Sequence, residues 1–100
     1  MSMDSVHRFL IAYDISDDPR RVRIAKTLQA YGDRIQYSVF IVDTKPAKLI
    51  RLRADLQQII DTRLDSVLIC SLGPLAHGGA RRIEYVGRKR PIMEQEPLIV

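Results

Sequence analysis

The sequence predicts a single α+β domain, and three observations support this. Runs rich in β-branched and aromatic residues begin near residues 7, 34 and 65, and helical apolar spacing separates them. A polar, alternating run follows at residues 81–87. A chain of 100 residues has room for one domain with one modest core.

The first half of the chain is expected to form a strand, a helix and a second strand. Residues 7–15 (HRFLIAYDI) have two largely apolar faces, as a central strand has. Asp18 followed by Pro19 predicts a helix start, and apolar residues at helical spacing extend that helix to about Gly32. Residues 34–42 (RIQYSVFIV) then predict one strand with one apolar and one mixed face, nearer an edge.

The second half is expected to begin with an amphipathic helix that follows DTKP and ends near Arg63. Residues 65–72 (DSVLICSL) predict another strand that is apolar on both faces, and residues 81–87 (RRIEYVG) a more polar one. We interpret these elements as the order βαββαβ, the ferredoxin-like plan, with the two doubly apolar strands in the middle of the sheet. Residues 1–87 form this domain and residues 88–100 a C-terminal extension.

One face of such a sheet has no helix over it, because right-handed crossovers place both helices on the same side. We expect Phe9, Ile11, Tyr13 and Phe40 on the uncovered face, and assign Tyr13 and Phe40 to a homodimer interface formed through it. The extension ends on Leu98, Ile99 and Val100, and is expected to add a strand to a neighbour's sheet edge.

Charge favours a phosphate-rich partner. The net charge is +4, and 12 of the 16 cations are Arg, whose planar guanidinium grips phosphate at two points. Cys70 is the only cysteine, so no internal disulfide forms, and its apolar setting indicates a small buried residue. No apolar run is long enough to span a bilayer and no signal peptide opens the chain, so we expect a cytoplasmic protein without membrane contact.

Residues 13–40 (YDISDDPRRVRIAKTLQAYGDRIQYSVF) resemble the CRISPR-associated protein-two (Cas-two) family. The similar features are an aromatic residue and Asp ending the first strand, an Arg-rich helix start, a Tyr-Gly helix end, and Arg-x-Gln-x-Ser-Val-Phe on the next strand. The resemblance implies a ferredoxin-like homodimer and magnesium-dependent phosphodiester cleavage in some members. It also implies assembly with the CRISPR integrase during spacer acquisition.

Asp14 has three interpretations from the sequence: a metal ligand, a helix cap, or a salt-bridge partner of a nearby Arg. It lies four residues before Asp18, too far upstream to cap the helix. Spacing alone leaves a pair with Arg21 or Arg34 open, and the family resemblance favours a Mg²⁺ ligand. Asp17 and Asp18 are expected to serve as turn and cap residues.

The arginines near this junction are predicted to contact phosphate. By motif position, the resemblance implies cleavage roles for Tyr13, Arg21, Arg23, Arg34 and Phe40. We assign Asp14, Arg21 and Arg34 to catalysis, with the two arginines as phosphate holders. Nucleic-acid binding is assigned to Arg20, Arg23, Arg81 and Arg82, although a solvated basic surface also explains the last two.

Two function classes follow: a Mg²⁺-dependent endonuclease of RNA or DNA, and a non-catalytic dimeric scaffold that holds protospacer DNA for the integrase. An RNA-recognition module has the same element order but stacks bases on aromatic residues of its third strand, and residues 65–72 contain none. A small regulatory ferredoxin-like domain does not account for the Asp-Arg junction.

Overall fold

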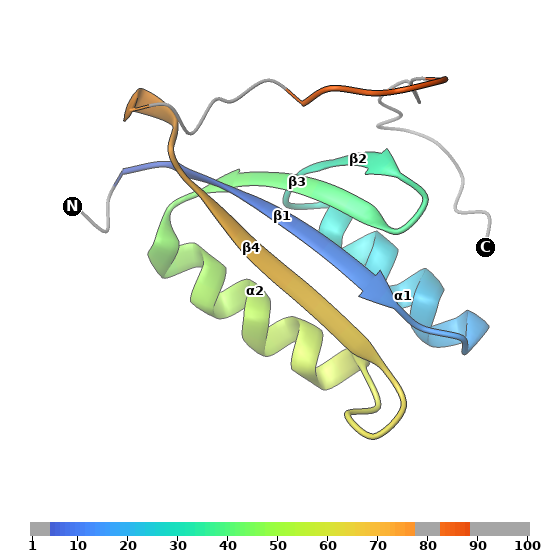
Figure 1. Cartoon of the computed structure of the whole chain (residues 1–100). Coiled ribbons are helices and arrows are strands. Elements are labelled where there is room, and N and C mark those ends of the chain that lie inside the picture. The colour runs from blue at the N-terminus through green and yellow to red at the C-terminus, as the bar shows by residue number, and fades with distance from the viewer. Residues whose placement is uncertain (1–4, 78–82, 89–100) are drawn as a thin grey trace.

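The computed structural model describes residues 5–77 and 83–88, which form a four-stranded sheet and two α-helices (Figure 1). In chain order the elements are β1 (His7–Asp14), α1 (Asp18–Gln29), β2 (Asp33–Gln36), β3 (Val39–Thr44), α2 (Pro46–Ile59), β4 (Ser66–Pro74) and the short 3-10 turn η1 (Leu75–His77). The strand order is β2-β3-β1-β4 and every neighbouring pair is antiparallel. The predicted α+β class and the ferredoxin-like βαββαβ order are therefore confirmed.

The single strand predicted at residues 34–42 is wrong, because this segment is a hairpin. β2 ends at Gln36, Tyr37 and Ser38 make the turn, and β3 pairs with β1 from Thr44 opposite His7 to Val39 opposite Ala12. The apolar alternation runs on through the turn, and neither Gly nor Pro interrupts it. Sequence periodicity therefore gave no sign of the reversal.

The hairpin also changes which strands are central. β1 and β3 occupy the middle of the sheet, whereas β4 lies at its edge, so the central position predicted for residues 65–72 is wrong. Residues 83–88 form no strand, and the rest of the strand predicted at 81–87 lies outside the described residues. Counted segment by segment, the elements expected from the sequence are βαβαββ. The observed order is βαββαβ because residues 33–44 form two strands, β2 and β3, instead of one, and residues 83–88 form none.

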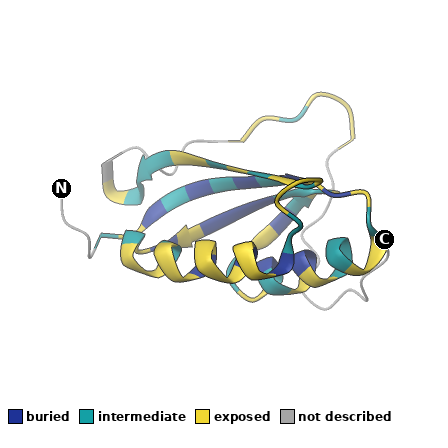
Figure 2. Ribbon diagram, turned by 90° about the horizontal axis from the view of Figure 1, so that it is seen from below, coloured by how far each residue is buried: buried dark blue, intermediate teal, exposed yellow. Residues whose placement is uncertain are grey.

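Both helices pack on one face of the sheet (Figure 2). The core between them is a cluster of apolar side chains: Phe9, Ile11, Tyr13, Ile15, Ile24, Ala25, Leu28, Phe40, Val42, Leu52, Leu56 and Ile59. The expectation that Phe9, Ile11, Tyr13 and Phe40 lie on the uncovered face is thus wrong. The period of two selects the right set of residues but does not say which face the helices cover.

The uncovered face is nevertheless apolar. It carries the alternate residues of the three longer strands, and their register sets Leu10 between Ile41 and Cys70, and Ala12 between Val39 and Leu68. Leu68 is 55% exposed, and Cys70 is exposed rather than buried as the sequence indicated. An uncovered apolar surface of this kind is typical of an interface.

The ends of the helices differ slightly from those predicted. Asp17, not Asp18, is the N-cap of α1, and its carboxylate accepts a hydrogen bond of 3.0 Å from the Arg20 amide. α1 ends at Gln29, and a Cβ built on Gly32 would lie 2.2 Å from the Ile41 carbonyl oxygen. Gly32 therefore lets the chain pass close to β3. Within the described residues, no helix is long and apolar enough to cross a membrane.

Candidate functional site

Asp14 is the last residue of β1 and its side chain is exposed. It lies on the uncovered face, opposite Ser66 at the start of β4. Within residues 5–77 and 83–88, no ion pair or side-chain hydrogen bond involves its carboxylate. Among the described residues, Asp14 therefore neither caps the helix nor forms a salt bridge, which were two of the three interpretations from the sequence.

Arg20 instead pairs with Asp65, a residue 45 positions further along the chain. Its Nε and Nη2 donate to the two carboxylate oxygens at 2.6 and 3.1 Å, and the Asp65 side chain is fully buried. The Arg20 guanidinium is the main reason why the pKa of Asp65 lies below its usual range. This pair ties the start of α1 to the loop before β4, so Arg20 is occupied within the chain.

Arg21 holds the loop that follows Asp14. Its Nη1 donates to the carbonyl oxygens of Ile15 and Ser16 at 2.9 and 3.2 Å, and its Nη2 pairs with Asp18. These bonds from one guanidinium fix the path of the chain between β1 and α1. Arg21 is near Asp14 in the chain, but its two terminal nitrogens already bond to the protein's own carbonyls and to Asp18.

Arg34 is buried, with 6% of its surface exposed, and sits among aromatic rings on the helix side of the sheet. Its guanidinium carbon lies 5.5 Å from the centroid of the Phe40 ring and 5.7 Å from that of Tyr37. Its Nη2 donates to the Tyr13 hydroxyl at 3.4 Å, and that hydroxyl donates to the Tyr37 carbonyl at 3.5 Å. Arg34 and Asp14 thus lie on opposite faces of the sheet.

The structure places Tyr13 and Phe40, assigned to the dimer interface, inside one chain. Their ring centroids are 6.4 Å apart, and both side chains are buried in the core. Tyr13 is also bonded to the hairpin through its backbone, because its N–H donates to the Ser38 carbonyl at 3.1 Å. The two aromatics therefore anchor the β2–β3 hairpin against the end of β1 that carries Asp14.

Of the three other arginines predicted to bind nucleic acid, the structure describes one. Arg23 is exposed on α1 and has no ion-pair partner in the part of the chain that the structure describes. Arg81 and Arg82 lie outside that part. Of the four arginines assigned to nucleic-acid binding, Arg23 is the described one whose charge is free for a ligand.

The chemistry available to a metal at Asp14 is limited but sufficient for one kind of ion. No group of three or more His, Cys, Asp or Glu side chains able to hold a metal occurs among the described residues. Mg²⁺ commonly keeps several waters and takes only one or two protein carboxylates. A single exposed carboxylate that forms no ion pair with the described residues fits that ion, and does not fit a closed site such as that of structural zinc.

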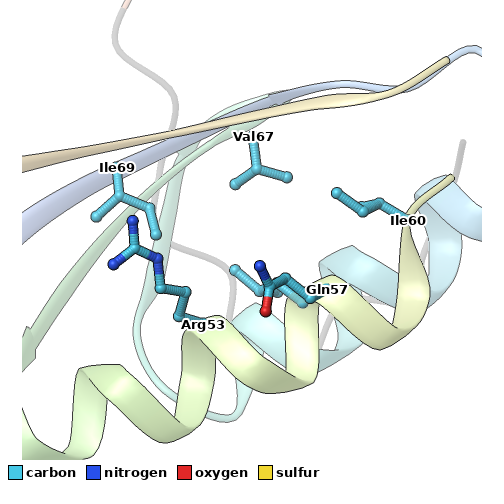
Figure 3. A pocket seen from close by; sticks show the side chains of 6 residues that line it. Arg53, Gln57, Ile60, Val67 and Ile69 are labelled. Atoms are coloured by element: carbon cyan, nitrogen blue, oxygen red, sulfur yellow. The ribbon is translucent and has the colours of Figure 1, made fainter. Parts of the chain in front are cut away.

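A cavity of about 270 Å³ lies between α2 and β4, away from Asp14. Figure 3 shows Arg53 and Gln57 of α2 facing Val67 and Ile69 of β4 across it. The two β4 residues pack against the core, so this cavity opens on the helix side of the sheet. It is therefore separate from the uncovered face on which Asp14 lies.

Sequence reasoning missed two features of this region. Asp65 was not singled out, and nothing in the local sequence signals a pair formed over 45 residues. Ser66 was also missed, because its position opposite Asp14 depends on the register between β1 and β4. Knowing that residues 65–72 form an antiparallel neighbour of β1 would have located both.

Comparison with known proteins accounts for this combination of fold and junction. The family model described as CRISPR associated protein Cas2 matches residues 7–75. The chain belongs to the Cas2 family. A relative from Rhodospirillum rubrum, the CRISPR-associated endoribonuclease Cas2 3, is 41% identical over an alignment that covers 91% of this chain and 98% of the relative. The CRISPR-associated endoribonuclease Cas2 of Chlorobaculum tepidum is 40% identical and the alignment covers 82% and 88%.

Solved structures agree with this assignment. Streptococcus pyogenes Cas2 at pH 6.5 superposes with a TM-score of 0.68 and 34% identity, covering 80% of this chain and 99% of that one. A Thermus thermophilus protein, TT1823, superposes with a TM-score of 0.72 and 32% identity, covering 88% and 99%. The resemblance predicted from residues 13–40 is confirmed, and in this Cas2 that run extends from the end of β1 through the hairpin.

Proposed function

We propose that this Cas2 is a CRISPR adaptation protein that acts with the CRISPR integrase in spacer acquisition, and that it cleaves phosphodiester bonds with Mg²⁺ held at Asp14. The observation that carries the cleavage proposal is the state of Asp14, an exposed carboxylate at a strand end without an ion-pair partner in the described structure. The Rhodospirillum and Chlorobaculum relatives are named endoribonucleases, which supports RNA as the first substrate to test.

Each part of the junction has a separate task in this proposal. A bound Mg²⁺ would offset phosphate charge and lower the pKa of a coordinated water. Asp14 supplies the ligand, Arg21 keeps the loop after it in place through the Ile15 and Ser16 carbonyls, and Arg23 supplies a free cation for phosphate. Because one chain offers one such carboxylate, we propose that a second copy brings its own Asp14 to the site.

The proposed homodimer forms through the uncovered face of the sheet. Leu68 is 55% exposed there, opposite Ala12, and the next pair on that face is Leu10 and Cys70. Replacing Leu68 with Asp should dissociate the dimer in sedimentation velocity at micromolar concentration. Ile50→Asp is the matched control, because Ile50 is 63% exposed but lies on α2, away from that face. A wild-type chain that sediments as a monomer would reject the dimer.

A second function, the non-catalytic scaffold, is favoured by the arginines. Arg20, Arg21 and Arg34 each donate at least one hydrogen bond within the chain, which leaves fewer free groups for chemistry than the sequence indicated. In this case the protein holds nucleic acid for the integrase and Asp14 has no catalytic task. The two functions predict different effects on spacer acquisition when the Asp14 carboxylate is removed.

The deciding experiment substitutes Asp14 by Asn and measures cleavage, dimerisation, Tm, integrase binding and spacer acquisition. Mg²⁺-dependent cleavage of single-stranded RNA and of duplex DNA should disappear, while dimerisation and Tm stay unchanged, because an exposed, unpaired side chain contributes within about 0.5 kcal/mol to stability. Asp33→Asn, at another exposed Asp, controls for the removal of one negative charge. Integrase pull-down and spacer acquisition complete the set.

Each outcome has a distinct meaning. Loss of cleavage together with spacer acquisition supports chemistry as the biological role, whereas loss of cleavage with acquisition intact supports the scaffold. Cleavage that survives in Asp14→Asn at the wild-type rate would reject Asp14 as the metal ligand.

A further inference from the structure

A second candidate binding surface lies at the other end of β1 from Asp14. A cavity of about 560 Å³ opens between the end of β3 and the first two turns of α2. Seven residues line it: Val6, Asp43, Thr44, Lys45, Ala47, Lys48 and Arg51. We name it the cationic hollow. Three of its seven lining residues carry a positive charge, and the sequence analysis did not single out any of them.

The positive charge of the cationic hollow is not neutralised within the described structure. Lys45, Lys48 and Arg51 are exposed, and none of them forms an ion pair within residues 5–77 and 83–88. Asp43 is the one acidic residue in the lining, and its two carboxylate oxygens accept from Nε and Nη2 of Arg8 at 2.8 and 2.9 Å. The acid is thus engaged elsewhere, and an anion would meet three free cations.

The spacing of the cations suits a regular row of phosphates. Lys45, Lys48 and Arg51 follow one another at intervals of three residues, so they extend over roughly 9 Å along the helix axis. Successive nucleotides of a duplex strand rise about 3.4 Å each, so a row of this length along a duplex axis spans between two and three nucleotide steps. A protein partner is a poorer fit, because interface centres are rich in aromatic and large apolar residues, and the hollow offers only Val6 and Ala47.

We propose that the cationic hollow binds the phosphate backbone of duplex nucleic acid at a place separate from Asp14. Val6 directly precedes β1 and Thr44 ends β3, whereas Asp14 ends β1, so residues 7–13 of the strand lie between the two places. The inference rests on the proposed function in one respect, namely that the protein binds nucleic acid. It assigns the hollow to sequence-independent holding of the backbone and leaves cleavage to Asp14.

The test is the salt dependence of duplex binding by the full chain. The variant Lys48→Glu/Arg51→Glu reverses two charges in the hollow, and Lys26→Glu/Arg53→Glu reverses two exposed helical cations that do not line it. Because the first variant removes two phosphate-binding cations, its slope of log K against log salt should become shallower by about 1.8, and its affinity at 0.1 M salt should fall more than about tenfold. The control should keep the wild-type slope.

A neutral variant, Lys48→Gln/Arg51→Gln, removes the two positive charges without adding repulsion and should show the same change in slope. Wild-type slope and affinity in both hollow variants would overturn this inference alone, and if integrase binding then fell, the hollow would be assigned to an acidic protein surface. If the wild-type chain binds no nucleic acid, both this inference and the proposed function fail. Asp14→Asn should keep the wild-type slope, since it contributes no cation.

Discussion

Arg34 offers the sharpest test of whether the junction arginines hold phosphate or hold the fold. The sequence assigned it to phosphate, but the structure buries it between the Phe40 and Tyr37 rings with a hydrogen bond to the Tyr13 hydroxyl. Replacing Arg34 with Met keeps much of the stem and removes the charge and the donors. The variant loses the cation–π attraction to both rings, which contributes about 0.5–2 kcal/mol for each ring. It also removes the free-energy cost of burying one charge, which partly offsets that loss.

We expect a net decrease of about 1.5 kcal/mol in the free energy of unfolding, which lowers the Tm of a domain of this size by about 6–12 °C. The assay is thermal unfolding at one fixed protein concentration, because dimerisation makes Tm depend on concentration. Nucleic-acid affinity below the transition should change little, since the guanidinium faces the protein's own rings. The salt slope of binding should also stay at the wild-type value.

Arg23→Met is the control, because Arg23 is exposed and has no ion-pair partner in the described structure. It should reduce affinity and leave Tm within a few degrees. The reasoning about Arg34 is refuted if Arg34→Met keeps or raises Tm while affinity falls and the salt slope becomes shallower. That result would mean that the guanidinium leaves the rings to meet phosphate.

Two further predictions follow from the packing and a third from the sequence of the C-terminal extension. Gly32→Ala should cost about 1–3 kcal/mol in thermal unfolding, because its Cβ would lie 2.2 Å from the Ile41 carbonyl oxygen; an unchanged Tm would show that the chain moves aside freely. Asp65→Asn should lower Tm at pH 7. The folded-state pKa of Asp65 is depressed chiefly by the Arg20 hydrogen bond, so its contribution is present above the unfolded pKa of about 3.9, and the difference from wild type should shrink as pH falls below that value. Removing residues 91–100, which lie outside the described structure, should weaken dimerisation or integrase binding, and unchanged assembly would reject the proposed extension strand.

Much of the fold was predictable because it depends on local patterns. β1, the start of α1 beside Pro19 and the apolar stripe of α2 all follow from spacing within a few residues. The hairpin after Gln36 was not predictable in this way, because its turn residues Tyr37 and Ser38 fit the alternation of a continuous strand. The face covered by the helices was likewise undetermined, since both faces of β1 are apolar.

The candidate site shows the same difference between features with a local sequence signal and features without one. Asp14 was singled out from its place at a strand end, and it is exposed there, but its role as a metal ligand stays a prediction. The internal partners of the arginines gave no signal in the sequence, because they are either distant, as with Asp65, or backbone carbonyls, as with Ile15 and Ser16. Backbone acceptors are invisible to a pattern of side chains, so the number of free cations was overestimated.

The position of Asp14 links the proposed chemistry to the proposed dimer. Its carboxylate lies on the uncovered face, in line along β1 with Ala12 and Leu10, which are the residues that a second copy would cover. In the proposed dimer, a metal site at the margin of the interface would receive further ligands from the partner, and two-fold symmetry makes the partner contribute the same residue. Arg21 and the Arg20–Asp65 pair fix the two loops next to Asp14 and Ser66. In the proposed function these internal bonds keep the surroundings of Asp14 in place, and among the described residues the Asp14 carboxylate forms no ion pair that would compete with a ligand.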